Sequence, residues 1–174
     1  MTASRGHKLV VADYSSIEAR VLAWVAKQHD LVRQFEAGED IYCSFASDIF
    51  GKKITKADKT ERMVGKVGIL GLGYGMGAAR FKGTLKDWCG LEVDLMFAQK
   101  VVDTYRNRYA NIKYFWWALN SGAMEAMKEG ESSCGKWYLG EGSLQYTLPS
   151  GRIIRYQKPR LVVGKFGNDA IQYI

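Results

Sequence analysis

Two kinds of hydrophobic spacing run along the chain and predict most of its secondary structure. A short apolar, β-branched run over 8–12 predicts a strand. Ser15-Ser16-Ile17-Glu18 has the S-x-x-E spacing of a capping box, so we expect a helix to begin there. Apolar residues at helical spacing predict further helices over 40–50, 56–72, 78–89, 94–109 and 112–129.

The C-terminal part of the chain changes to an alternating pattern. Residues 143–148 and 152–156 alternate on either side of Pro149-Ser150-Gly151, which predicts a β-hairpin. The predicted order is one strand, a run of helices and then a β-ribbon. This order favours an α+β fold that is predominantly α-helical over a repeated βαβ fold.

Composition indicates a globular chain with an anionic partner. The 174 residues are 47% hydrophobic and carry a net charge of +7. Six basic and two acidic residues lie in 51–67, and five basic and no acidic residues lie in 152–165. These clusters either bind a polyanion or are solvated basic faces. No uncharged run approaches the ~18 residues of a membrane span, and three cysteines without C-x-x-C spacing indicate reduced thiols in the cytoplasm.

Asp13 and Glu18 form the first candidate site. Asp13 follows the predicted strand and precedes the predicted helix. A carboxylate there suits Mg²⁺, which takes hard oxygen ligands from carboxylates and substrate phosphates. The alternative is that Asp13 and Glu18 only cap the helix.

A second candidate site follows 61–78, where Arg62, Lys66, Leu70 and Tyr74 recur every four residues. Arg62 and Lys66 are one helical turn apart, so together they suit a triphosphate. Glycines at 65, 68, 71, 73 and 75 weaken a helix, which implies either that a flat ligand such as a base pair approaches the backbone or that this is a glycine-rich loop.

The same stretch also matches a dinucleotide-binding turn. Gly73-x-Gly75-x-x-Ala78 fits G-x-G-x-x-A, and Glu92 and Asp94 lie about 20 residues beyond it. That reading requires a strand over 67–72 and predicts an NAD(P)-binding Rossmann-type oxidoreductase domain. Aromatic residues farther on, Tyr105, Tyr109, Phe115, Trp116 and Trp117, are either a base-stacking surface or helix-packing core.

A resemblance to a known family favours the first interpretation. DYSSIEARVLA at 13–23 resembles motif A of the family A DNA polymerases. Arg62-x-x-x-Lys66-x-x-x-Leu70-Gly71-x-x-Tyr74-Gly75 resembles motif B, the nucleotide-binding helix of the fingers, and GEDIYCSFASDIFG is similar to the segment before it. The resemblance covers about 8–82 and implies a fingers subdomain with an edge of the palm sheet. It divides the chain into a flexible end at 1–6, palm edge plus fingers at 7–156, and a basic segment at 157–174 that leads back to the palm.

The resemblance implies a role for each matching residue. Asp13 and the Tyr14 carbonyl would bind Mg²⁺, and Arg62 and Lys66 would hold the triphosphate, with Lys66 protonating the leaving pyrophosphate. Three residues at the nucleotide differ from the usual ones of the family: Tyr42 replaces a histidine, Ser16 a glutamine and Leu70 an aromatic residue. Glu18 would block a ribose 2′-hydroxyl and bond to Tyr74. Tyr74 would lie near the templating base. Gly75 would contact DNA. Apart from the resemblance, the basic charge of the hairpin predicts that Arg152 and Arg155 either contact DNA phosphates or belong to a solvated face.

One carboxylate that this family requires is missing from the chain. The family's second metal-binding aspartate lies in a His-Asp-Glu motif after the fingers, whereas His29-Asp30 comes before them and is followed by leucine. We therefore expect a polymerase fragment that is inactive alone. Its expected partners are primer-template DNA, deoxynucleoside triphosphates and the absent palm and thumb, in the cytoplasm of a bacterium or a phage-infected cell. Two further alternatives are a single-subunit RNA polymerase, against which Glu18 argues, and a nucleic-acid-binding module without chemistry.

Overall fold

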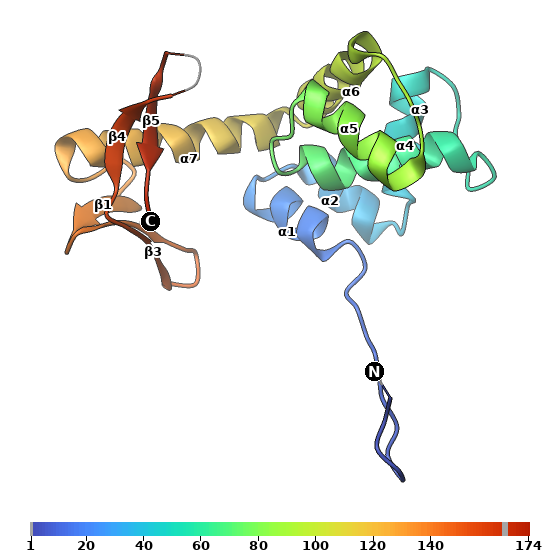
Figure 1. Ribbon diagram of the computed structural model, residues 1–174, viewed down its shortest axis with the longest axis horizontal. Helices are drawn as coiled ribbons and strands as arrows, with labels where there is room; N and C mark the ends of the chain where they lie inside the picture. Colours follow the sequence, from blue (N-terminus) through green and yellow to red (C-terminus); the bar gives the residue numbers. More distant parts are fainter. Residues whose placement is uncertain (1, 165–166) are drawn as a thin grey trace. The chain divides into compact units, whose positions relative to one another are not determined.

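The computed structural model describes residues 2–164 and 167–174, and these residues form two compact units, one ending at Ile112 and one beginning at Lys113. The elements appear in Figure 1. The helices are α1 (Ile17–Val25), α2 (His29–Glu36), α3 (Ile41–Phe50), α4 (Lys59–Leu72), α5 (Ala78–Cys89), α6 (Leu95–Arg108) and α7 (Ala110–Glu129). The strands are β1 (Trp137–Gly140), β2 (Ser143–Thr147), β3 (Ile153–Gln157), β4 (Arg160–Val163) and β5 (Asp169–Gln172). The predominantly helical α+β class is confirmed.

The first unit is built around a close crossing of α3 and α4. A methyl group added at Gly65 would overlap the Tyr42 carbonyl oxygen and lie 3.0 Å from the Ala46 Cβ atom. At Gly68 it would lie 2.5 Å from a ring carbon of Phe45. Gly65 therefore lets α4 approach the backbone of α3, and Gly68, one turn farther on, leaves room for the Phe45 ring.

This crossing corrects the interpretation of those two glycines. The sequence suggested a flat ligand against the backbone of α4 or a glycine-rich loop. Instead, Gly65 and Gly68 lie inside a continuous helix, are buried and face α3. The helical stability that they sacrifice is offset by the packing of α3 on α4.

The Rossmann-type alternative is also wrong. Residues 67–72 form the last turns of α4 and not a strand. Within the described chain, every paired strand is antiparallel and lies beyond residue 136. Gly73 caps a helix C-terminus, so the turn that Gly73, Gly75 and Ala78 would form after a parallel strand does not exist.

The predicted strand over 8–12 does not form. These residues have no regular structure, and Leu9, Val10 and Val11 are 55%, 87% and 83% exposed. A strand needs a neighbour to accept its backbone hydrogen bonds. None of the described strands pairs with this segment. The apolar pattern is therefore that of a strand without a partner in the described chain.

The capping box before α1 does not form either. The helix begins at Ile17, and its N-cap is Ser16, whose side chain makes no capping hydrogen bond. The Ser16 hydroxyl instead contacts Tyr42, at 2.9 Å between the two oxygens. The spacing of Ser15 and Glu18 predicted the start of the helix correctly, but no side chain caps it.

Arg108, near the end of α6, ties three helices together. It pairs with Asp48 on α3 and donates to the Ser44 carbonyl at 3.2 Å and the Ser44 hydroxyl at 2.9 Å. It also donates to the Gln34 side chain on α2 at 3.3 Å. A rigid guanidinium with five N–H groups can make this set of bonds, which a lysine cannot.

We expect Arg108→Met to destabilise the chain by about 2 kcal/mol, because the Ser44 carbonyl and Asp48 lose a charged donor. Arg106→Met removes the same charge from the same helix and should cost less than about 0.5 kcal/mol. Urea unfolding followed by circular dichroism compares the two variants. Equal losses would show that Arg108 is an ordinary surface charge.

Tyr105 and Tyr109 are core residues, as one of the two alternatives predicted. Both rings pack on Phe45, with centroids 5.7 and 6.1 Å from it. Burial raises the pKa of Tyr109 to about 12. Trp117 differs, because it is 60% exposed and lies beside Tyr114, with ring centroids 5.5 Å apart.

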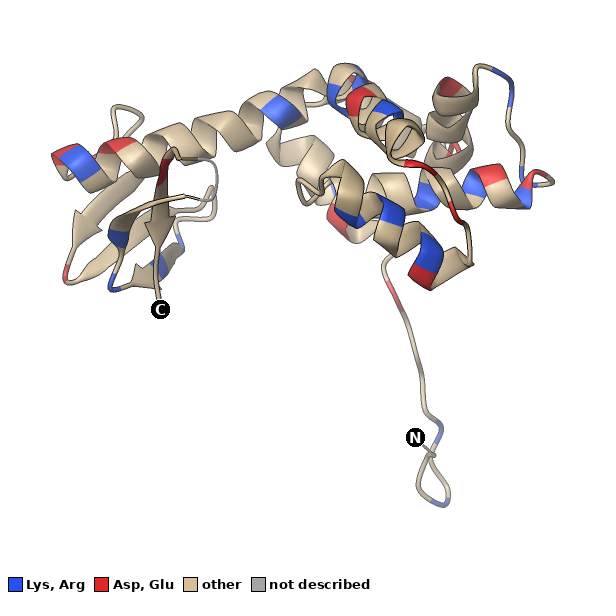
Figure 2. Ribbon diagram, turned by 45° about the horizontal axis from the view of Figure 1, so that its top comes forward, with Lys and Arg blue, Asp and Glu red and all other residues tan. Residues whose placement is uncertain are grey.

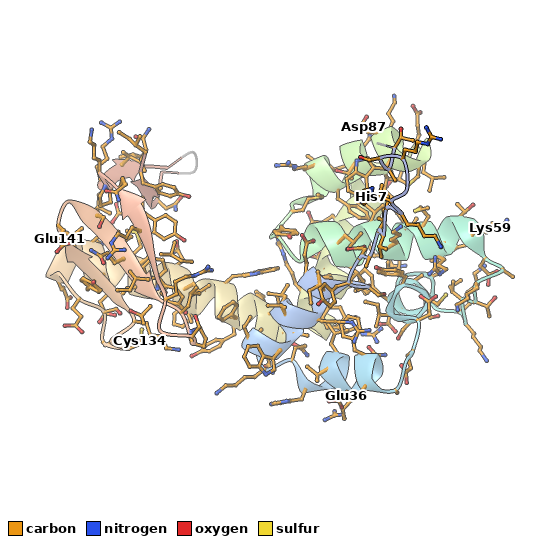
Figure 3. All side chains as sticks on the ribbon, turned by 90° about the horizontal axis from the view of Figure 1, so that it is seen from below. His7, Glu36, Lys59, Asp87, Cys134 and Glu141 are labelled. Atoms are coloured by element: carbon orange, nitrogen blue, oxygen red, sulfur yellow. The ribbon has the colours of Figure 1, made fainter. Side chains whose placement is uncertain are left out.

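The second unit packs α7 against small antiparallel sheets. The order of the three-stranded sheet is β1-β2-β3, and β4 pairs with β5. The predicted hairpin is confirmed: β2 and β3 pair from Ser143 with Gln157 to Thr147 with Ile153. Leu144 and Trp137 pack on Ala123 and Ala126 of α7. Figure 3 marks Cys134 and Glu141 in this unit.

None of the helices among the described residues is long and apolar enough to cross a bilayer. The three cysteines are free thiols: Cys43 is buried, Cys89 half-buried and Cys134 exposed.

Candidate functional site

One cavity of about 470 Å³ gathers most of the predicted site residues. Its walls come from the segment before α1, from the first turn of α1, and from α3 and α4. The lining residues are Asp13, Tyr14, Ser15, Ser16, Ile17, Glu18, Tyr42, Lys66 and Leu70. Residues from three separate parts of the first unit therefore line the same cavity.

The α3–α4 crossing explains how Tyr42 and Lys66 reach the same cavity. Gly65 touches the Tyr42 carbonyl, and Lys66 is the next residue on α4. Lys66 and Leu70 are one turn apart, so both lie on the same side of the helix. The blue segments on α4 in Figure 2 show that this helix carries several basic residues. The close contact at Gly65 thus brings Tyr42 and Lys66 near enough to line the same cavity.

A hydrogen bond joins the segment that carries Asp13 to α3. The Ser16 hydroxyl and the Tyr42 hydroxyl are 2.9 Å apart. Ser16 has a φ of 54°, a left-handed conformation that non-glycine residues adopt rarely. The chain therefore makes a sharp turn at Ser16, between Asp13 and the first turn of α1.

Arg62 does not line the cavity, because it is paired with Asp40. Its Nε and Nη2 atoms both lie 2.9 Å from the Asp40 Oδ2 atom. Its guanidinium carbon lies 5.3 Å from the centre of the Tyr42 ring, which does line the cavity. Asp40 is the N-cap of α3 and accepts from the Tyr42 and Cys43 amides at 3.1 Å.

These contacts set the charge state of Asp40. Partial burial acts to raise the pKa of Asp40, but the Cys43 amide and the Arg62 guanidinium outweigh it and hold that pKa below its ordinary value. The carboxylate is therefore stabilised as an anion, which favours its ion pair with Arg62.

We expect Asp40→Asn to lower stability at pH 7, because asparagine keeps the helix cap and loses the ion pair. The folded pKa of Asp40 lies below the unfolded value of about 3.9, so the stabilisation is present above that value and is lost as pH falls through the lowered folded pKa. Urea unfolding at pH 7 and at about pH 2 measures the difference. Asp87→Asn, an exposed substitution on α5 (Figure 3), serves as the control. If the free energies of unfolding of wild type and Asp40→Asn differed by the same amount at both pH values, the ion pair would not be the cause of the difference.

Glu18 connects the cavity to Tyr74. A hydrogen bond to Glu18 raises the pKa of the Tyr74 phenol. Tyr74 itself is 72% exposed and does not line the cavity. Gly75 follows it with a φ of 73°, and a methyl group there would meet nothing within 4 Å. The backbone is open at this point.

The structure thus divides the predicted site residues into four groups, one of which is Gly75 alone, exposed and outside the cavity lining. Seven line the cavity: Asp13, Tyr14, Ser16, Glu18, Tyr42, Lys66 and Leu70. Arg62 and Tyr74 touch cavity residues without lining it. Arg152 and Arg155 are exposed in the second unit.

Sequence analysis missed Asp40 as a partner of this site. An aspartate just before an apolar helical run is a recognisable N-cap, so its capping role could have been found. Its pairing with Arg62, 22 residues away, had no signal in the sequence.

The donor set at the cavity fits a cation shared with a phosphate. Asp13 supplies one carboxylate. The Tyr14 carbonyl accepts from the Ile17 amide at 3.3 Å and retains a second lone pair. Across residues 2–164 and 167–174, no three His, Cys, Asp or Glu side chains cluster as metal ligands do. One carboxylate and one carbonyl suit Mg²⁺ that takes its other ligands from substrate phosphates and water.

Comparisons with known proteins identify relatives of this chain. Residues 1–133 match the model of DNA polymerase family A. A DNA polymerase of Bacillus phage SP02 is 33% identical over 179 aligned positions, which cover 98% of this chain and 27% of the phage protein. DNA polymerase I of Chloroflexus aurantiacus is 39% identical over 100 residues, covering 56% of this chain and 11% of that protein. A thermostable DNA polymerase I of Thermus thermophilus is 42% identical over 83 residues, covering 48% and 10%. The chain spans about a quarter of the length of the phage relative.

Proposed function

Because the chain belongs to DNA polymerase family A, we propose that it forms the nucleotide-binding part of a template-directed DNA polymerase. The reaction would add a deoxynucleoside triphosphate to a primer 3′ end and release pyrophosphate. The observation that carries this proposal is the single cavity that Asp13, Tyr42 and Lys66 line together. An anionic and a cationic wall facing one space suit a triphosphate bound with a divalent cation.

Lys66 and Arg62 would bind the triphosphate. Lys66 lines the cavity as a compact point charge and would donate a proton to the leaving pyrophosphate. Arg62 uses its Nε atom and one side of Nη2 on Asp40, which leaves Nη1 and the rest of Nη2 for phosphate oxygens. The Tyr42 hydroxyl would donate one neutral hydrogen bond.

Asp13 and the Tyr14 carbonyl would hold Mg²⁺. When bound, the ion supplies charge neutralisation of the phosphates and activation of the primer 3′-hydroxyl, as in two-metal phosphoryl transfer. The chain's own contribution is to bring Asp13 and Lys66 to the same cavity. Asp13 is the one carboxylate that we assign to the metal, because Glu18 is assigned to the sugar, so we propose that the chain alone does not extend a primer. Primer extension in Mg²⁺ tests this, and extension by the isolated chain would refute it.

Glu18 and Leu70 would select the sugar and Tyr74 would select the base. Glu18 lies in the cavity wall, where its side chain would block the space that a ribose 2′-hydroxyl needs and that deoxyribose leaves free. Leu70 supplies apolar contact without ring stacking. Tyr74 and the open backbone at Gly75 are exposed, as a surface for a templating base pair requires.

The second unit would contact DNA phosphates. Arg152, Arg155, Lys158 and Arg160 are exposed around β3 and the start of β4. Exposed basic side chains on a ribbon suit backbone contacts that carry no sequence information. The complete enzyme would add palm and thumb subdomains, and the unpaired strand-like segment at 8–12 would join the palm sheet. It would act in the cytoplasm of a bacterium or a phage-infected cell.

Ligand-dependent thermal stabilisation tests the proposal. We expect dATP with Mg²⁺ to raise the melting temperature of the chain, whereas NAD should leave it unchanged. Lys66→Ala should remove the dATP effect. Stabilisation by NAD, or by DNA alone with no response to dATP, would overturn the proposal.

A further inference from the structure

The segment that carries Asp13 is held by side chains and not by regular structure. Residues 8–14 are exposed and have no helix or strand. Asp13 and Tyr14 nevertheless line the cavity together with Lys66. Something must therefore hold the turn between Tyr14 and Ile17 in place.

Arg20 is one of the residues that hold this turn. Its Nε atom donates to the Ser15 carbonyl at 2.9 Å. Its guanidinium carbon lies 4.4 Å from the centre of the Phe35 ring, and Phe35 is a buried residue of α2. Arg20 therefore joins α1, α2 and the turn, with one face on an aromatic ring and one edge on a backbone carbonyl.

The Ser15 carbonyl is a sensitive point of the turn. It belongs to the peptide plane between Ser15 and Ser16, and the orientation of this plane sets the φ angle of Ser16. That angle is 54°, in the left-handed region that L-residues avoid. Ser16 retains this conformation only where its surroundings enforce it. Two contacts hold Ser16 in this conformation: Arg20 binds the Ser15 carbonyl, and Tyr42 contacts the Ser16 hydroxyl.

We propose that Arg20 is a positioning residue that fixes Asp13 in the cavity by holding the Ser15 carbonyl. Its effect on nucleotide binding rests on the proposed function, but its effect on the turn does not. Arg20 is exposed on the side away from Phe35 and does not line the cavity. It acts through the backbone and not by contact with the nucleotide.

Amide hydrogen exchange tests the effect on the turn. The Ile17 amide donates to the Tyr14 carbonyl at 3.3 Å, so its exchange rate reports opening of the turn. Arg20→Met should raise the Ile17 rate at least about tenfold, and Arg20→Lys, which keeps a cation over Phe35, should raise it less. Arg33→Met removes the same charge from an exposed site on α2 and should leave the rate unchanged. Equal rates in Arg20→Met and Arg33→Met would overturn the proposal.

A binding cycle tests the link to Asp13. We expect Arg20→Met to weaken binding of dATP with Mn²⁺, and this loss should vanish in an Asp13→Asn background, because nothing remains to position. The same loss in both backgrounds would overturn the proposal, since Arg20 would then act independently of Asp13. If the wild-type chain binds no dATP, the proposed function fails, and the Ile17 exchange rates still decide the role of Arg20. Circular dichroism establishes that each variant is folded.

Discussion

Gly65→Ala is expected to destabilise the first unit, although alanine is the better helix former. Alanine at an exposed helix position gains about 1 kcal/mol over glycine. At Gly65, however, the added methyl group overlaps the Tyr42 carbonyl oxygen, a backbone atom that cannot rotate away. Overpacking of this kind costs roughly 1–3 kcal/mol or more. We therefore expect a net loss of about 2 kcal/mol, measured by urea unfolding.

Gly83→Ala is the matched control for this prediction. Gly83 lies inside α5, and a methyl group there meets nothing within 4 Å. The same substitution should therefore stabilise the chain by up to about 1 kcal/mol. Opposite signs for the two variants would establish the α3–α4 contact. If both variants were stabilised, the helices would not touch at Gly65.

Lys66→Met is expected to cause the largest loss of nucleotide binding. Methionine keeps most of the aliphatic stem and removes the charge from the cavity wall. Loss of a charged contact to phosphate costs about 1.5–3 kcal/mol, which corresponds to roughly 10- to 100-fold weaker binding of dATP with Mg²⁺. Isothermal titration calorimetry at fixed ionic strength measures this change.

Lys59→Met controls for net charge. Lys59 begins the same helix, is exposed and does not line the cavity (Figure 3). Since exposed charges are screened within about 8–10 Å in physiological salt, we expect less than about a twofold change. Equal losses in the two variants would mean that α4 attracts nucleotide only through its overall charge.

Local patterns in the sequence predicted most of the helices and the C-terminal hairpin. The hydrophobic spacing of α3 to α7 matches their burial, because each helix packs one face on its neighbours. Helix α2 was missed, because His29–Glu36 is short and mostly polar. Strands β1, β4 and β5 were also missed, because four residues carry too little alternation to be recognised.

Contacts between distant residues were outside the reach of sequence patterns. The glycines of α4 suggested a ligand, whereas Gly65 and Gly68 pack against α3, which only the crossing of the two helices reveals. Ser15 and Glu18 have the capping-box spacing, but the N-cap is Ser16, whose hydroxyl contacts Tyr42, 26 residues away. The apolar residues at 8–12 have the pattern of a strand that pairs with another strand and is buried in a sheet. None of the described strands pairs with them.

The shared cavity of Asp13 and Lys66 is tested most directly by paramagnetic broadening. Mn²⁺ added with dATP to isotope-labelled chain broadens amide signals within a limited distance of the ion. The account predicts that signals of Asp13 to Glu18, Tyr42 and Lys66 broaden first, and that Asp13→Asn abolishes this selectivity. Broadening that is confined to other acidic positions, or that is unchanged in Asp13→Asn, would contradict it.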